Sequence, residues 1–382
     1  NPRPDLASNL LDLVRRASVL PRSAVANSPS RRASTWATVP RALLPLLAAL
    51  ALLGSAACAG GDGERAATVQ LGGWERVEPG GETRCARGGK YAFWIRKGDP
   101  KKLLVFFQGG GGCFDVTTCQ PGSMWFDDSV DFGDDPEANG GGVLDVANAE
   151  NPFRDYSIVY IPSCGGDVHV GSRVVEYGPY RVHQKGWLNA QAALEHTYRE
   201  VPDAESVFVT GCSAGSVGSA LHVDGILKQY PDAHVTQVGD SLAFVFHRPV
   251  NLESWGAHEH FPEWFRPQRA NGRWTMTEFL TALAEQYPER TFGRFNYAQD
   301  NVQQAFYQAV GGKPGGFSPR LLRAERELKE LPNYRSFLAC GSDHCAFDRS
   351  RLYTTTAEGT RLRDWVADLA AGKDVDCPEC RG

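Results

Sequence analysis

The sequence predicts an α/β protein, in which a mostly parallel sheet is flanked by helices on both faces. Short apolar runs bounded by turn residues indicate buried strands. They lie at 103–107, 157–161, 206–210 and 235–238. Amphipathic stretches with apolar residues at helical spacing indicate helices. They lie at 186–199, 214–230 and 360–370. Strands that alternate with helices favour a sheet covered on both faces.

The N-terminal part of the chain has the composition of an export segment. An apolar run of signal-peptide length follows Arg41 and ends in small residues before Cys58, and it is shorter than a membrane span. A buried helix is the alternative interpretation. Membrane contact is expected only through a lipid anchor, if Cys58 is lipidated. The resulting division is a disordered leader at 1–40, a signal peptide at 41–58, a linker at 59–72 and a folded catalytic domain at 73–382.

Composition excludes one class of partner and suggests an insertion. The 382 residues carry a formal net charge of -5 and no stripe of Lys and Arg, which argues against a nucleic-acid partner. Residues 251–290 are rich in Trp, His, Phe and Pro and interrupt the alternation of strands and helices. We interpret them as an insertion, either a lid that lines a substrate pocket or a small satellite core.

The strongest motif is a Gly-x-Ser-x-Gly pattern between a predicted strand and a predicted helix. Gly211 and Gly215 flank Ser213, and this strand–turn–helix context is typical of the nucleophile elbow of α/β-hydrolases. Ser213 is therefore the candidate nucleophile, and the N–H group of Ala214 points toward a developing oxyanion. The alternative is a Gly/Ser turn that caps a helix.

A second motif is the glycine run that follows the first predicted buried strand, at 109–112. Hydrolases of this type place further oxyanion donors at this position. Glycines let the backbone N–H groups approach a substrate carbonyl without obstruction by side chains. A flexible loop without function is the alternative.

A serine nucleophile needs a base and an acid that orients it, and in this fold they follow the serine in the order acid, then histidine. His344 follows an apolar strand and precedes the last helix, so it is the candidate base. Asp300 follows another apolar strand and is the candidate acid, with Asp240 as the runner-up. His222, directly after the elbow, is interpreted as a surface residue.

Ten cysteines agree with an oxidising compartment. Without Cys58 the number is odd, so one thiol is expected to be unpaired. Cys212, in the buried turn beside Ser213, is the candidate. Two pairs are close enough in sequence to bond locally, although the connectivity cannot be deduced: Cys113 with Cys119, and Cys377 with Cys380. A zinc site at Cys340, Cys345, Cys377 and Cys380 is the rival interpretation.

Several motifs together resemble the pectin acetylesterase family, which includes animal Notum carboxylesterases. Gly-Cys-Ser-Ala-Gly-Ser at 211–216 is similar to its nucleophile motif, Gln-Gly-Gly-Gly-Gly-Cys at 108–113 to its glycine loop, and Asp-His-Cys at 343–345 to its catalytic-histidine segment. The resemblance implies Ser213, Asp300 and His344 as a triad, Gly110, Gly111 and Ala214 as oxyanion donors, and a structural role for Asp240. The chain departs from the pattern at Gln108, at Gly111–Gly112 and at Ser216.

The sequence therefore predicts a secreted, periplasmic or cell-envelope serine esterase that needs no metal or organic cofactor. The resemblance implies O-acetyl groups on a polysaccharide such as pectin as the substrate. Two alternatives stay open: a deacylase of longer acyl esters, and a non-catalytic glycan-binding protein on a hydrolase scaffold.

Overall fold

The computed structural model describes residues 73–245, 252–266 and 274–380. All of them belong to one of the two units into which the chain divides. The other unit, Val19–Thr68, and the proposed leader, signal peptide and linker lie outside the described residues.

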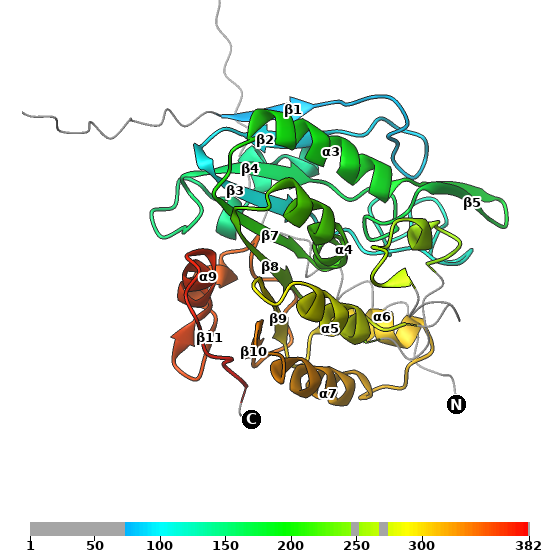
Figure 1. Cartoon of the computed structure of the whole chain (residues 1–382). Coiled ribbons are helices and arrows are strands. Elements are labelled where there is room, and N and C mark those ends of the chain that lie inside the picture. Colours follow the sequence, from blue (N-terminus) through cyan, green and yellow to red (C-terminus); the bar gives the residue numbers. More distant parts are fainter. Residues whose placement is uncertain (1–72, 246–251, 267–273, 381–382) are drawn as a thin grey trace, which may run out of the picture. The chain divides into compact units, whose positions relative to one another are not determined.

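An eight-stranded sheet organises the described residues, with the strand order β1-β2-β4-β3-β7-β8-β9-β10 (Figure 1). The six strands from β4 to β10 in this order run parallel, and β2 and β1 continue the sheet in antiparallel pairing. This confirms the predicted fold class. The strands are β1 (Trp74–Val77), β2 (Phe93–Arg96), β3 (Asp99–Phe107), β4 (Tyr156–Ile161), β7 (Ser206–Cys212), β8 (His234–Asp240), β9 (Thr291–Tyr297) and β10 (Tyr334–Ala339).

Helices cover both faces of this sheet. The α-helices are α2 (Pro136–Asn139), α3 (Gly186–Glu200), α4 (Ala214–Gln229), α5 (Met276–Gln286), α6 (Asn301–Ala309), α7 (Phe317–Lys329), α8 (Arg351–Thr354) and α9 (Leu362–Ala370). Short 3-10 helices lie at η1 (Phe132–Asp134), η2 (Gly142–Leu144) and η3 (Ala257–Glu259). Two hairpins stand apart from the main sheet: β5 (Arg173–Tyr177) with β6 (Tyr180–Gln184), and β11 (Thr356–Ala357) with β12 (Thr360–Arg361).

The alternation of side chains along each strand divides the core into two layers. On β3, Leu103, Val105 and Phe107 pack with α3, α4 and α5. Leu104 and Phe106, on the opposite face, pack with η2 and α9. All five side chains are fully buried, which is why the strand reads as an unbroken apolar run in the sequence. Figure 1 shows α3, α4 and α5 side by side on one face and α9 on the other.

The parallel strands place their carboxyl ends along one edge of the sheet. β3 ends before the glycine run, β7 before Ser213, β8 at Asp240, β9 shortly before Asp300 and β10 shortly before His344. Open α/β sheets bind ligands at this edge. Residues that are far apart in the sequence therefore meet in one site.

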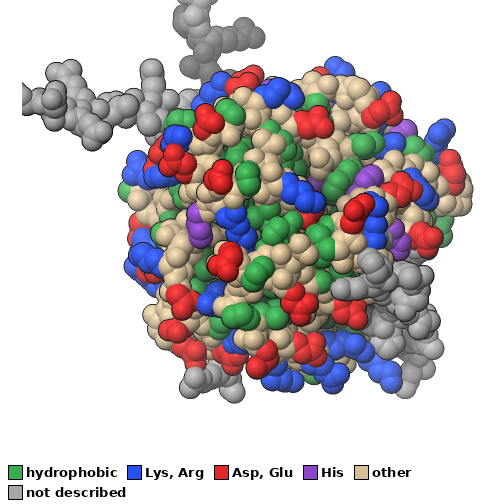
Figure 2. Space-filling view, in the orientation of Figure 1, with side chains coloured by type: hydrophobic (Ala, Val, Ile, Leu, Met, Phe, Trp, Pro, Cys, Tyr) green, Lys and Arg blue, Asp and Glu red, His purple; other side chains and the backbone are tan. Residues whose placement is uncertain are grey.

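None of the helices in the described residues is long and apolar enough to cross a membrane. On the face shown in Figure 2, acidic and basic side chains are interspersed.

Candidate active site

Ser213 lies in a strained turn between β7 and α4. Its backbone has φ 56° and ψ −119°, a conformation that costs a non-glycine residue about 1–3 kcal/mol. The neighbouring glycines are required for steric reasons. A Cβ on Gly211 would lie 2.4 Å from the carbonyl oxygen of Gly215, and one on Gly215 would lie 2.0 Å from that of Phe107. This geometry is that of a nucleophile elbow.

The base and acid candidates are in direct contact. Nδ1 of His344 lies 2.7 Å from Oδ2 of Asp300, and Asp300 is fully buried. The carboxylate can only accept, so Nδ1 carries the proton, and Nε2 of the neutral ring is free to take one. Burial by itself lowers the pKa of His344. The charge and hydrogen bond of Asp300, together with the charges of Asp240 and Asp348, outweigh burial, so the pKa of His344 lies above its usual value.

Asp240, the runner-up acid, is also fully buried but bonds to backbone instead of the imidazole. Its Oδ2 accepts the N–H groups of Ala346 and Phe347, both at 2.7 Å. Its backbone carbonyl accepts the N–H of Ser213 at 2.9 Å. Burial raises the pKa of Asp240 to about 7, aided by the charge of Asp348 and opposed by the two N–H bonds. Asp240 therefore holds both the elbow and the segment that follows His344.

The three expected oxyanion donors keep their N–H groups available. Gly110, Gly111 and Ala214 donate no hydrogen bond to any other described residue, whereas the N–H of Ser213 is already used. Gly111 has φ +67°, and a Cβ there would lie 2.0 Å from the carbonyl oxygen of Trp125. A Cβ on Gly110 would lie 2.7 Å from the Cβ atom of Ser163. Both positions therefore require glycine.

The start of the glycine loop is fixed by Gln108 and a buried histidine. The Gln108 side chain donates to Oδ1 of Asp134 at 2.7 Å and accepts the N–H of Ser163 at 3.1 Å. Its backbone carbonyl lies 2.8 Å from Nε2 of His169. Burial lowers the pKa of His169 to about 4, so the neutral ring donates to this carbonyl at neutral pH. A glutamate at position 108 would face the carboxylate of Asp134, which explains why an amide fits here.

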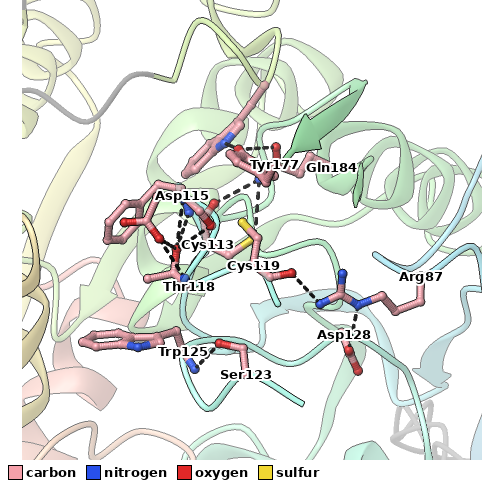
Figure 3. Close-up of a disulfide and its surroundings, with 12 residues drawn as sticks. Arg87, Cys113, Asp115, Thr118, Cys119, Ser123, Trp125, Asp128, Tyr177 and Gln184 are labelled. Carbon is pink, nitrogen blue, oxygen red and sulfur yellow. Dashed lines mark hydrogen bonds and ion pairs between the residues drawn. A yellow bond between two sulfur atoms is a disulfide. The ribbon is translucent and has the colours of Figure 1, made fainter. Parts of the chain in front are cut away.

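The far end of the glycine loop is held by a disulfide (Figure 3). Cys113 bonds to Cys119, which confirms the predicted local pair. Gln184 donates to the carbonyl of Cys113 at 3.1 Å, and Arg87 donates to the carbonyl of Cys119 at 2.8 Å. The two ends of the loop are therefore anchored, and the donors between them are held in place.

A second disulfide joins the neighbours of the nucleophile and the base. Cys212, next to Ser213, bonds to Cys345, next to His344, across 133 residues of sequence. The expectation that Cys212 is unpaired is therefore wrong. Packing of the elbow against the 344–347 segment brings the two sulfur atoms together. This pairing could not be predicted, because the two cysteines are far apart in the sequence.

The C-terminal cysteines also pair differently from the expected local bond. Cys380 bonds to Cys340, and Cys377 is the free thiol among the described residues. The zinc interpretation is excluded because Cys340, Cys345 and Cys380 are all in disulfides. Cys212, His344 and Cys345 lie close enough to one another to resemble a metal site, but sulfur in a disulfide is not a thiolate ligand. Cys85 with Cys164 completes the four disulfides of the described residues.

Ser213 and His344 line the same cavity, which has about 700 Å³ of empty space, part of it open to solvent. The other polar side chains of the lining belong to Ser241, Gln303 and Tyr307, and the rest of the wall is mostly apolar. The apolar lining residues are Phe114, Val168, Val217, Leu242, Phe244, Val245, Trp255, Val302, Phe306 and Phe317. Gly111 and Ala214, two of the three oxyanion candidates, line it as well. A carbonyl at Ser213 would therefore have donors beside it and apolar space behind it.

The aromatic insertion contributes to both the cavity and the core. Trp255 lines the cavity, whereas Phe261, Phe265 and Phe279 are buried and contact one another. The last of them lies on α5, which covers the sheet. A lid function for 251–290 stays a prediction.

His222 is a buried residue, so its interpretation as a surface histidine is wrong. It is 1% exposed, its Nε2 lies 2.8 Å from the carbonyl oxygen of His169, and its ring stacks between Phe107 and Trp187. Helix α4 is covered on this side by α3, which the pattern of one helix could not indicate.

One site residue that the sequence analysis missed is Gln303. It lines the cavity, and its side chain donates to Oδ2 of Asp300 at 3.0 Å. Asp300 is the N-cap of α6 and accepts the backbone N–H of Gln303 at 2.9 Å. The spacing of an N-cap Asp followed three residues later by Gln is a capping-box signal, and it could have pointed to this residue.

The elbow at the carboxyl edge of a parallel sheet, with the following histidine and aspartate in contact, defines the chain as a protein of the α/β-hydrolase type. The family model of pectinacetylesterases matches residues 77–268, half of the chain. The chain therefore belongs to the pectinacetylesterase family. The match includes Ser213 and the glycine loop, and it ends before Asp300 and His344.

Curated relatives come from animals and plants. A Notum palmitoleoyl-protein carboxylesterase of Schmidtea mediterranea is 28% identical over 152 residues, which are 38% of this chain and 29% of the relative. Pectin acetylesterase 4 of Arabidopsis thaliana is 28% identical over 191 residues, 44% of this chain and 46% of the relative. The Notum carboxylesterase of Drosophila melanogaster is 31% identical over 153 residues, which are 37% of this chain and 22% of the relative. The chain thus spans less than half the length of each of these relatives.

Proposed function

We propose that this chain is an exported serine carboxylesterase that removes O-acetyl groups from a polysaccharide. The observation that carries the proposal is one cavity lined by Ser213 and His344, with Asp300 bonded to the far side of the imidazole. Family membership supports ester hydrolysis, and relatives named pectin acetylesterases support an acetylated glycan. Four disulfides support an oxidising compartment.

The reaction is a two-step acyl transfer. Nε2 of His344 takes the proton of Ser213 as Oγ attacks the ester carbonyl carbon, and Asp300 stabilises the imidazolium. The negative charge on the carbonyl oxygen is held by the N–H groups of Gly110, Gly111 and Ala214. The C–O bond to the alcohol then breaks, and His344 gives its proton to the departing oxygen.

The second step regenerates the enzyme. Water attacks the acyl-serine while His344 again takes a proton, and the same donors hold the oxyanion. The carboxylic acid leaves, and the proton returns from His344 to Ser213. Water is the only co-reactant, and the products are one acid and one alcohol.

A longer acyl group is the second candidate substrate, and the apolar cavity wall favours it. An acetyl group needs little of this space, whereas each further methylene buried in it contributes about 0.8 kcal/mol. Relatives named palmitoleoyl-protein carboxylesterases agree with this candidate.

Hydrolysis of 4-nitrophenyl esters from acetate to decanoate tests both candidates. We expect Ser213→Ala to reduce kcat by more than about 10⁴-fold, since a hydrolase without its nucleophile keeps only residual catalysis. The matched control is Ser206→Ala, at the opposite end of the same strand β7, which should keep wild-type activity.

Ester turnover that survives in Ser213→Ala contradicts the proposed function. A kcat/KM that rises from acetate to octanoate selects the longer acyl group, and one that falls selects acetate. Glycan binding by a wild-type protein inactive on every ester would support the non-catalytic alternative.

A further inference from the structure

The side-chain amide of Gln303 makes three hydrogen bonds to three separate segments. Its Nε2 donates to Oδ2 of Asp300 at 3.0 Å and to Oδ1 of Asn296 on β9 at 3.1 Å. Its Oε1 accepts the backbone N–H of Ala243 at 2.9 Å. An N–H group can only donate, so the amide oxygen must face Ala243 and the amide nitrogen must face the carboxylate. The orientation of this side chain is therefore fixed by chemistry.

Gln303 restrains the carboxylate of Asp300 from both sides. Its backbone N–H binds Oδ1 and its side chain binds Oδ2, the oxygen that also accepts from His344 at 2.7 Å. A carboxylate bonded in this way cannot rotate about its Cβ–Cγ bond without losing a donor. Oδ2 consequently stays directed at the imidazole.

The same amide restrains one wall of the cavity. Ala243 lies between Leu242 and Phe244, and both of these line the cavity. Phe244 has a positive φ of 45°, so this segment needs tertiary support to keep its course. The hydrogen bond from Ala243 to Gln303 ties this segment to α6, whose Val302 also lines the cavity.

We propose that Gln303 is a positioning residue that couples the two functions of this site: it orients Asp300 for His344, and it fixes the wall at Ala243 against which the acyl group packs. The inference rests on the proposed esterase function. It deepens that function because a single side chain, Gln303, then affects both the orientation of Asp300 and the selection of the acyl group.

The charged groups around Gln303 fall into two sets. Those near His344 are acidic, and the one that contacts Asn296 is held in an ion pair. Asp300, Asp240 and Asp348 all favour protonation of His344. Asn296 donates to Glu325 at 3.3 Å, and Glu325 forms a buried ion pair with Arg294 at 3.0 Å. An added negative charge at position 303 would therefore lie beside the carboxylate of Asp300, and Arg294, the cation of this network among the described residues, is already paired with Glu325.

Gln303→Glu removes the donor that binds Asp300 and Asn296 while keeping an oxygen for Ala243. Two carboxylates that share a site repel each other, and the extra charge stabilises the imidazolium. We expect kcat for 4-nitrophenyl octanoate to fall by tenfold or more. The acid limb of kcat/KM against pH should move upward by about one unit, while KM changes less than threefold. The matched control is Gln304→Glu, the same change one residue along, where the amide bonds only to the carbonyl of Gln299.

Gln303→Leu removes all three side-chain hydrogen bonds, including the one to Ala243 that supports the cavity wall. A net hydrogen bond contributes about 0.5–1.5 kcal/mol, so we expect KM for octanoate to rise roughly threefold to tenfold over that of the Glu variant. The ratio of kcat/KM for octanoate to kcat/KM for acetate should fall accordingly. Thermal denaturation of each variant verifies that the protein is folded. If Gln303→Leu does not fold, the comparison of Gln303→Glu with Gln304→Glu tests the proposal by itself.

The outcomes separate this inference from the proposed function. If wild-type activity depends on Ser213 but Gln303→Glu matches Gln304→Glu in kcat and in pH profile, Gln303 is not a positioning residue and the esterase stands. If Ser213→Ala keeps full activity, both fall. A loss of thermal stability without any displacement of the pH profile also overturns the inference, because a merely structural residue would behave in that way.

Discussion

Two aspartates at neighbouring strand ends are both buried in the site, yet they bind different kinds of partner. Asp240, at the end of β8, accepts two backbone N–H groups of the segment that follows His344. Asp300, three residues after the end of β9, contacts the His344 ring itself. A carboxylate bonded to backbone fixes a loop, whereas one bonded to a titratable ring changes what that ring can do. Burial alone therefore does not identify the acid of a triad.

The largest expected effect is on Asp300. An Asn there has to present its NH₂ group either to the backbone N–H of Gln303 or to His344, and both are donors. The negative charge that holds the imidazolium is lost as well. We expect Asp300→Asn to lower kcat by about 10⁴-fold and to shift the acid limb of the pH profile downward, because the pKa of His344 is then no longer raised. Steady-state ester hydrolysis between pH 5 and 9 measures both.

Loss of less than tenfold in kcat for Asp300→Asn, with the pH profile unchanged, would remove Asp300 from the triad. Unfolding of the variant by heat, compared with wild type, verifies that the change acts on chemistry and not on the amount of folded protein.

Asp240 should show its effect mainly in stability. Asp240→Ala leaves the N–H groups of Ala346 and Phe347 buried without an acceptor, at about 1–3 kcal/mol each in free energy of unfolding. Asp240→Asn keeps an oxygen for both, so we expect a smaller stability loss and a kcat within tenfold of wild type. Urea denaturation of the pair measures the difference. If Asp240→Asn loses as much activity as Asp300→Asn, the distinction between the two aspartates is wrong.

Asp240 also makes the free energy of unfolding depend on pH. Its pKa is raised from 3.8 to about 7 in the folded protein, so the folded state binds the proton more tightly than the unfolded state. This contribution is fully present below about pH 4 and is lost as the pH rises through 7.

Asn does not titrate, so the stability of wild type relative to Asp240→Asn should fall between pH 4 and 7. The slope should be at most about 1.4 kcal/mol per pH unit. Denaturation curves at several pH values test this, and a constant difference across the window would mean that Asp240 stays ionised throughout.

Local patterns in the sequence were sufficient where one segment carries the whole signal. The elbow could be predicted because a strand, two glycines and a helix follow one another within one stretch around Ser213. The glycine loop could be predicted for the same reason, since it directly follows the buried strand β3. Asp300 and His344 were selected because each follows a strand, and the carboxyl ends of parallel strands share an edge.

Predictions failed where the answer depended on segments far apart in the sequence. Cys212 was expected to be free, but the fold brings it to Cys345. Cys380 is close enough in sequence to Cys377 for a local bond, but it bonds to Cys340. His222 was placed on the surface because its own helix gave no indication that α3 covers it. Each error concerns a neighbour supplied by tertiary packing.

The alternation of strands and helices, the turn at Ser213 and the glycines that this turn requires can be predicted from the sequence alone, because backbone conformation and apolar periodicity are local properties. The assembled fold was needed to show which aspartate contacts His344, which distant cysteines pair, and that the Gln303 side chain bonds to Ala243. These are distances between segments that become neighbours only when the sheet assembles, and neither the spacing nor the composition of the chain contains them.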